Sequence, residues 1–449
     1  MGKKAVALFS ALAMMVVFGL ADTASAKVSS LRWKFGTLAP QGVGWARHIE
    51  GLVLPAIKEA TDGYLAVKTY WGGVMGDEED YIRKMHIGQL HGAGMSGQGA
   101  VMVCPEMAVV ELPFMFRNFD EVDYIKTRMS ETFDGIMREN GYFMVAWVDQ
   151  DLDQIYSIKA PIAEPRDFEN TTFITWYGPL EETLLRTLGA KIIPVNVPEV
   201  PSAIRQGMAD AAIGPALFTV GAQLYTVYKY VTPINIRYSP SVIVVTNEAW
   251  AKLPEKYHGK FYDLRDDLMT RFALAVRKDN QEALNAMYKY GIKKVEPSPQ
   301  QLAALKKRCL PLWDKMADTL YPRELLDEML IYLAEYRGEK APKRTGPTFA
   351  QAAPKAAPVP IAPKTAPKTG TKTASSPKKP SPPEGLVITR NIIRQVQIVL
   401  ADEGLYNIGI DGLFGPKTFW GIKRYQRKHG LSVTGAIDRR LLDEMRIPY

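Results

Sequence analysis

The chain has 449 residues, of which 47% are hydrophobic and 23% are charged, a balance typical of two to three globular domains rather than of a disordered chain. Its 56 basic and 48 acidic side chains give a formal net charge of +8. Residues 27–338 carry −4, whereas residues 339–384 carry +7 and residues 385–449 carry +4. Because the largest segment is slightly acidic, a nucleic-acid-binding body is excluded.

The first 26 residues have the pattern of a secretory signal peptide. Lys3 and Lys4 precede an apolar run over residues 5–21, and residues 24–26 (Ala-Ser-Ala) form a small-x-small cleavage site. An uncleaved membrane anchor is the alternative, but the run is shorter than the ~20 residues that a spanning helix needs. The pattern predicts an exported, soluble, periplasmic protein.

The large module, residues 27–338, alternates strand-like apolar runs with helical patterns. This alternation predicts an α/β fold with largely parallel sheets and two lobes. Strands are expected at residues 31–37, 64–71, 142–148, 172–177 and 241–246. Helices are expected at residues 77–87, 180–188 and 201–206, and helical patterns dominate residues 254–290 and 299–336.

Residues 339–384 separate this module from a small one, residues 385–449. The segment holds 11 of the 31 prolines, which alternate with Ala, Lys and Thr. Such a composition cannot bury a core and predicts an extended linker.

Few residues indicate catalysis, a metal or a cofactor. Cys104 and Cys309 are expected to be separate buried thiols, with a disulfide as the alternative. Residues 92–97 spell G-x-G-x-x-G, but a helical pattern precedes them, which favours a glycine-rich strand end beside a cleft over a nucleotide site. The five histidines lack metal-ligand spacing, and no nucleophile has an evident base. We therefore predict a protein without catalytic residues, metal or cofactor.

Three carboxylates alternate along the chain at Asp149, Asp151 and Asp153. In an extended segment they would share one side, which suits a cation, an ammonium ligand or calcium. A solvated acidic turn is the alternative.

Several motifs occur in a characteristic order along the large module. They are residues 70–76 (YWGGVMG), 85–90 (MHIGQL), 104–106 (CPE), 111–117 (ELPFMFR), 188–190 (LGA), 194–199 (PVNVPE) and 203–210 (AIRQGMAD). In order and spacing they resemble the periplasmic solute receptors of the TRAP transporter family, of the dicarboxylate-receptor type. The resemblance implies two lobes that close over a small-molecule ligand, and small and large TRAP membrane subunits as partners.

Three positions depart from the pattern that this resemblance implies. Arginines that clamp a substrate carboxylate are replaced by Ile174 and Asp153, and an asparagine is replaced by Gly214. Neither Ile nor Asp can supply the bidentate fork of an arginine. We therefore expect that the ligand is not a simple dicarboxylate.

The matching cleft segments supply other side chains, which with the three aspartates suit an uncharged, aromatic or cationic ligand. A position in the core is the alternative for each aromatic residue. The candidates are Trp45, Gln98, Trp147, Trp176, Tyr177, Glu199, Phe218 and Tyr238.

The small module resembles a three-helix peptidoglycan-binding domain over most of residues 387–445. The residues that carry its motifs are Asp411, Gly412, Phe414, Gly415, Thr418, Tyr425 and Gln426. The whole chain then predicts a solute receptor tethered to the cell wall. A sensor or structural receptor without transport and a peptidoglycan-acting enzyme are the alternatives.

Overall fold

The computed structural model describes residues 31–342 and 389–406 and, beyond these, residues 410, 412, 418, 421–422, 425–426, 428–431 and 437–449. The predicted signal peptide and nearly all of the predicted linker lie outside the described residues. The chain divides into two compact units, Met1–Phe349 and Ala350–Tyr449, which we describe separately. Within the described part, no helix is long and apolar enough to cross a membrane.

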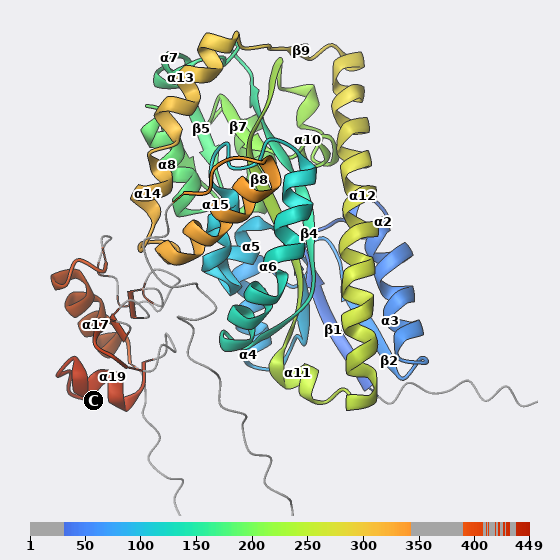
Figure 1. Cartoon of the computed structure of the whole chain (residues 1–449), viewed down its shortest axis with the longest axis vertical. Helices are drawn as coiled ribbons and strands as arrows, with labels where there is room; N and C mark the ends of the chain where they lie inside the picture. The colour runs from blue at the N-terminus through green and yellow to red at the C-terminus, as the bar shows by residue number, and fades with distance from the viewer. Residues whose placement is uncertain are drawn as a thin grey trace, which may run out of the picture. The chain divides into compact units, whose positions relative to one another are not determined.

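A mixed nine-stranded sheet forms the centre of the first unit, with the order β2-β1-β3-β8-β4-β7-β5-β6 and β9 beside β8 (Figure 1). The outer pairs β1–β2, β1–β3, β5–β6 and β5–β7 are parallel, as expected, but β8 pairs antiparallel with β3 and β4, and β7 with β4. The strands are β1 (Leu31–Thr37), β2 (Leu65–Tyr70), β3 (Gly92–Met95), β4 (Tyr142–Ser157), β5 (Thr172–Thr175), β6 (Lys191–Pro194), β7 (Ala211–Gly214), β8 (Tyr230–Thr246) and β9 (Lys293–Lys294).

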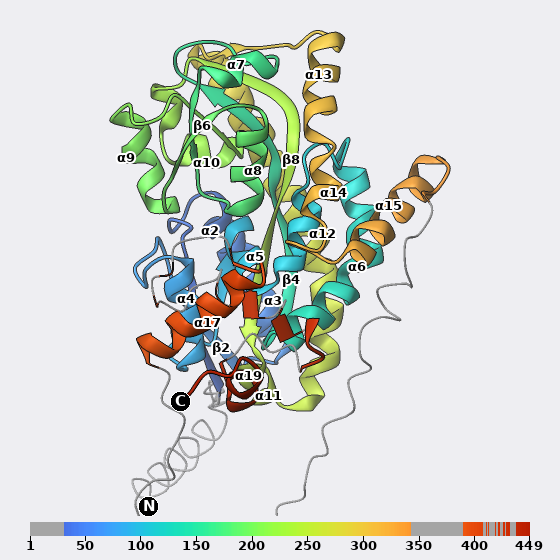
Figure 2. The ribbon, with the colours of Figure 1, turned by 90° about the vertical axis from the view of Figure 1, so that its left-hand side faces the viewer.

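Two long strands join the lobes. β4 has 16 residues and β8 has 17. The C-terminal end of β8 pairs with β3 in lobe 1, the lobe built on β1, β2 and β3. The C-terminal end of β4 pairs with β7 in lobe 2, the lobe built on β5, β6 and β7. We call β4 and β8 the hinge strands; they run the length of the unit beside the 33-residue helix α12 (Figures 1 and 2). The predicted two-lobed α/β architecture is confirmed.

Helices cover both faces of the sheet. Helices are present in the expected ranges 77–87, 180–188, 201–206, 254–290 and 299–336, whereas the other helices of this unit were not predicted. Asp77 caps α4 through a hydrogen bond from the backbone N–H of Asp80, and Ser298 caps α13 in the same way. The helices are α2 (Gly44–His48), α3 (Leu54–Ala60), α4 (Glu78–His86), α5 (Gly97–Val103), α6 (Phe119–Glu139), α7 (Pro165–Glu169), α8 (Pro179–Thr187), α9 (Val200–Arg205), α10 (Ala216–Gly221), α11 (Asn247–Ala251), α12 (His258–Tyr290), α13 (Pro299–Cys309), α14 (Leu312–Met316) and α15 (Arg323–Arg337). Short helical turns include η1 (Ile49–Val53), η2 (Pro105–Glu111), η3 (Val197–Glu199), η4 (Leu224–Thr226) and η5 (Glu255–Tyr257).

Both cysteines are buried and neither forms a disulfide, which confirms the expectation of separate thiols. Cys104 lies in a core cluster of lobe 1 and Cys309 in a core cluster of lobe 2. Burial raises the pKa of the Cys309 thiol to about 12, so it is protonated at neutral pH.

The second unit has its own small core. Its described helices are α17 (Arg390–Asp402) and α19 (Arg439–Glu444), with Thr389 capping the first and Asp438 the second. Apolar side chains of both helices meet those of Tyr406, Ile422 and Tyr425 in one cluster. This arrangement agrees with the expected small helical domain.

Candidate functional site

The two lobes touch each other at Gln150, on hinge strand β4. Its side-chain oxygen accepts a hydrogen bond from the backbone N–H of Gly97 in lobe 1, at 3.0 Å, and one from the hydroxyl of Tyr177 in lobe 2, at 3.2 Å. A Cβ atom at Gly97 would lie 3.0 Å from a ring carbon of Tyr177, so the absence of a side chain permits the contact. The run Gly92–Gly97 thus forms strand β3 at the interlobe contact, as the sequence predicted, and its last glycine begins α5, which the sequence did not predict.

A buried arginine, Arg237 of β8, lies beside this contact. Its Nε and Nη2 atoms are 3.0 and 2.9 Å from Oδ2 of Asp153, its cross-strand neighbour on β4. Its Nη1 atom is 3.7 Å from Glu111, at the end of η2 in lobe 1, and its Nη2 atom is 3.6 Å from Glu181, in the first turn of α8 in lobe 2. The guanidinium carbon lies 3.7 Å from the ring centre of Tyr177. We call these four ionisable residues (Glu111, Asp153, Glu181 and Arg237) the Arg237 cluster.

The Arg237 cluster is unbalanced in charge and in hydrogen bonding. Each of its four side chains is at most 1% exposed. One oxygen of each carboxylate (Glu111 Oε1, Asp153 Oδ1 and Glu181 Oε1) has no hydrogen-bond partner among the described residues, and neither has Nη1 or Nη2 of Arg237. Burial raises the pKa of Glu111 to about 8 and that of Asp153 to about 6, although the nearby guanidinium opposes both shifts.

The three alternating aspartates do not share one side of β4, so that prediction is wrong. β4 has an extra residue, Gln150, between Asp149 and Asp151, which pair with Pro240 and Ser239. Such a bulge places Asp149 opposite to the other two aspartates. All three are buried, which also contradicts the solvated turn.

Each aspartate has its own partners. Asp149 forms buried ion pairs with Lys126 and Arg277, which hold its pKa low against the opposing effect of burial. It also accepts the hydroxyl of Tyr238 at 2.6 Å. Asp151 accepts the backbone N–H of Ala216, at the start of α10, at 3.3 Å. Burial raises the pKa of Asp151, which has no cation partner in the described part of the chain. The aspartates therefore do not form a shared cation site.

Aromatic side chains gather in lobe 2 beside the Arg237 cluster. The ring of Trp176 lies 5.4 Å from that of Tyr177 and 5.7 Å from that of Phe218, on α10. At Gly214 a Cβ atom would lie 3.1 Å from Trp176, so this tryptophan fills the space next to the glycine. Ile174 is fully buried in the same cluster of lobe 2. Five sequence candidates thus lie together beside the interlobe contact.

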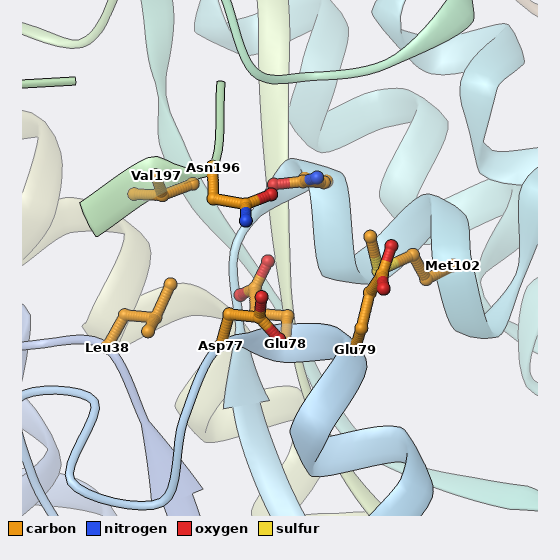
Figure 3. A pocket seen from close by; sticks show the side chains of 8 residues that line it. Leu38, Asp77, Glu78, Glu79, Met102, Asn196 and Val197 are labelled. Carbon is orange, nitrogen blue, oxygen red and sulfur yellow. The ribbon is translucent and has the colours of Figure 1, made fainter. Parts of the chain in front are cut away.

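A small cavity of about 10 Å³ lies between the lobes near Gln98 (Figure 3). It has room for about one water molecule. Three carboxylates and no basic side chain line it. Glu78, whose pKa burial raises, accepts hydrogen bonds from the backbone N–H and the hydroxyl of Ser96 at 2.5 and 2.6 Å. The lining residues are Leu38, Asp77, Glu78, Glu79, Gln98 and Met102 of lobe 1 and Asn196 and Val197 of lobe 2.

Four other candidates lie outside this contact. Trp147 and Tyr238 are core residues of lobe 1, and the indole nitrogen of Trp147 donates to the Tyr238 hydroxyl at 3.2 Å. Glu199 is exposed and accepts the backbone N–H of Asn196 at 3.3 Å, which caps η3. Trp45 packs against a second core cluster of lobe 1. Trp147, Tyr238 and Trp45 thus have the core positions that were the alternative for them, and Glu199 caps a helical turn at the surface.

The described part of the peptidoglycan-binding motif is also largely structural. The buried side chain of Gln397 accepts the backbone N–H of Gly412 at 2.8 Å and donates to the hydroxyl of Thr418 at 3.0 Å. Tyr425 and Gln426 are buried, and Tyr425 stacks on His429 at 4.0 Å. Three further residues of the motif lie outside the described residues: Asp411, Phe414 and Gly415.

Two lobes, two hinge strands and a closed interlobe contact define a protein of the bacterial solute-receptor class. Residues 53–319, more than half of the chain, match the bacterial extracellular solute-binding protein family 7 (DctP). The chain therefore belongs to this family, which confirms the TRAP-receptor resemblance. Residues 389–445 match the putative peptidoglycan binding domain, as the sequence predicted.

Known relatives agree with both assignments. A solute-binding protein of Verminephrobacter eiseniae is 25% identical over 213 residues, which are 46% of this chain and 62% of that protein. The crystal structure of the sugar acid binding protein DctPAm from Advenella mimigardefordensis, in complex with galactonate, has a TM-score of 0.63 at 18% identity and covers 68% of this chain and 98% of that one. The N-acetylmuramoyl-L-alanine amidase CwlL of Bacillus licheniformis is 49% identical over 49 residues, 10% of this chain and 14% of that protein.

Proposed function

We propose that the protein is a non-catalytic receptor in the periplasm, which captures a small organic solute between its lobes and delivers it to the membrane subunits of an ion-gradient-driven TRAP transporter. Family membership supports the receptor role. Closure of two lobes over a solute excludes water and completes polar contacts from both sides.

The solute is not a simple dicarboxylate. The observation that carries this proposal is the Arg237 cluster, in which three carboxylates of the chain already surround the buried guanidinium. A ligand carboxylate would add a further negative charge to a buried site that is already acidic, which is strongly unfavourable. The acidic lining of the cavity near Gln98 acts in the same direction.

Binding and mass spectrometry test this proposal. The solute that co-purifies with the full chain is identified by native mass spectrometry, and thermal shifts are measured with succinate, malate and galactonate. We expect shifts below those of the co-purified solute for all three acids. Micromolar affinity for succinate would contradict the exclusion of dicarboxylates.

We also propose that the C-terminal unit holds the receptor at the peptidoglycan. The match of residues 389–445 to the putative peptidoglycan binding domain supports this role, and the linker and C-terminal module together carry +11, which suits an anionic envelope polymer. At ~3.1 Å per residue in polyproline geometry, the linker could extend to roughly 140 Å and leave the receptor free to reach a membrane partner.

Co-sedimentation with purified sacculi tests the tether. The full chain is compared with a truncated chain that ends at residue 342. We expect the full chain in the pellet and the truncated chain in the supernatant, with retention that weakens as salt is added. Equal partitioning of the two proteins would rule out the tether and leave the receptor role intact.

A further inference from the structure

The Arg237 cluster has the features of a ligand subsite. The family assignment does not identify a subsite at these residues. Asp153 neutralises Arg237 through contacts of 2.9 and 3.0 Å. Glu111 and Glu181 lie within ion-pair distance of the same guanidinium, at 3.7 and 3.6 Å, so three carboxyl groups share one cation. We propose that the cluster binds the ammonium group of a small organic cation; this inference rests on the proposed receptor function and names its solute class.

Hydrogen bonding supports an ammonium group over other cations. Each carboxylate of the cluster has one buried oxygen without a partner, and the three come from η2, β4 and α8. An ammonium group has three N–H donors and no acceptor. Because a buried polar atom without a partner is costly, each of these oxygens that an ammonium group reaches stabilises the closed form.

The aromatic neighbours indicate an organic cation rather than a bare metal ion. The face of Tyr177 is already in contact with a cation, since the Arg237 guanidinium lies 3.7 Å from its ring centre. Trp176 and Phe218 extend this aromatic surface on the lobe 2 side. Such rings accept the ammonium group by cation–π contact and the carbon skeleton by apolar contact.

The charged groups of the cluster come from both lobes and from the hinge strands, which explains how a ligand can reach a buried site. Glu111 belongs to lobe 1, whereas Glu181 and Tyr177 belong to lobe 2, and Asp153 and Arg237 lie on the hinge strands. Separation of the lobes would part Glu111 from Glu181 and expose the guanidinium between them. Closure then brings the two carboxylates together around the ligand, which couples charge recognition to lobe closure.

Matched solutes test the charge that the cluster selects. Calorimetric titration of the full chain, freed of co-purified solute, uses chains of three to six carbons that end in a primary amine, a hydroxyl or a carboxylate. We compare amine, alcohol and acid of equal chain length, for example 1,4-diaminobutane, 1,4-butanediol and succinate. For at least one chain length, we expect the amine to bind about tenfold or more tightly than the alcohol and the acid. If the tightest binder of the panel is an acid or an alcohol, the inference is overturned and the receptor function stands. If no probe binds and no solute co-purifies, the receptor function fails as well.

A variant locates amine binding at the cluster. Glu111→Gln keeps the size of the side chain, and Glu111 makes no hydrogen bond that the fold requires among the described residues. We expect amine affinity to fall about tenfold or more. Glu328→Gln is the matched control, because Glu328 is also buried (7% exposed) and has one unpartnered oxygen, but it lies on α15. Equal amine affinity of the Glu111→Gln variant and the parent would overturn the assignment.

Discussion

Replacing Arg237 by leucine would remove the positive charge of the Arg237 cluster and leave three buried carboxylates. The guanidinium contacts Asp153 at 2.9 and 3.0 Å and faces Glu111 and Glu181 within 3.7 Å. Loss of one partner from a buried ion pair costs about 3–5 kcal/mol. Because the raised pKa of Glu111 leaves it largely protonated at neutral pH, we expect the lower end, about 3 kcal/mol at pH 7.

Urea denaturation followed by tryptophan fluorescence measures this loss at pH 7 and at pH 5. The carboxyl groups take up protons more readily once the guanidinium is gone, so the folded variant holds more protons than its unfolded chain, and acid favours folding. The difference in the free energy of unfolding from the parent should therefore shrink at pH 5. Arg271→Leu, at an exposed pair with Asp267, is the control and should change stability by about 1 kcal/mol or less.

If Arg237→Leu lowers the free energy of unfolding by less than about 1 kcal/mol at pH 7, the reasoning is refuted, because removal of one partner of a buried ion pair should cost more. A loss of the same size at pH 5 and pH 7 would show that packing, rather than charge, accounts for the effect.

Three further substitutions probe the same contact. The pKa of Glu111 is about 8 in the folded state against an ordinary 4.5, so the free energy of unfolding falls as the pH rises between these values. In urea titrations at several pH values, Glu111→Gln should make this fall shallower by about 1 kcal/mol per pH unit. An unchanged pH dependence would contradict the raised pKa. Gly97→Ala would place Cβ 2.8 Å from Glu111 and should hinder lobe closure, which X-ray scattering would show as a larger radius of gyration. Gly135→Ala is the control and should leave the radius of gyration unchanged, because a Cβ atom at Gly135 would meet open space. Gly214→Ala, whose Cβ would lie 3.1 Å from Trp176, should cost about 1 kcal/mol in thermal melts, and an unchanged melting temperature would argue against tight packing there.

The hinge strands show how far the sequence predicted the fold. Their apolar halves, residues 142–148 and 241–246, were expected as strands and are strands. The remaining halves were missed because carboxylates and amides follow residue 148 and Pro233 and Pro240 interrupt β8. These polar residues are buried through pairing between the strands, which local periodicity does not reveal.

The candidate site was predicted only in part, because pairing between strands again determines which side chains meet. Trp176, Tyr177, Phe218 and Gly214 come together as expected, because the resemblance aligned their segments. Three charged members of the cluster were missed (Glu111, Glu181 and Arg237). Glu111 stands in the recognised ELPFMFR motif and could have been selected, but Arg237 reaches the site through its register with Asp153, from a strand more than 80 positions away. Asp153, which the resemblance places at an arginine position of the family, thus binds an arginine from the other hinge strand.

If the Arg237 cluster binds the solute as proposed, the receptor should close only when it is loaded. In the closed conformation without solute, three carboxylates and one guanidinium are buried together, and five polar atoms have no hydrogen-bond partner among the described residues. Opening of the lobes returns these groups to water, so the empty receptor should favour the open conformation. A ligand cation that binds the closed form more tightly shifts this equilibrium by its difference in affinity for the two conformations. The same buried charges that weaken the empty closed form would then select the solute and signal its presence through closure.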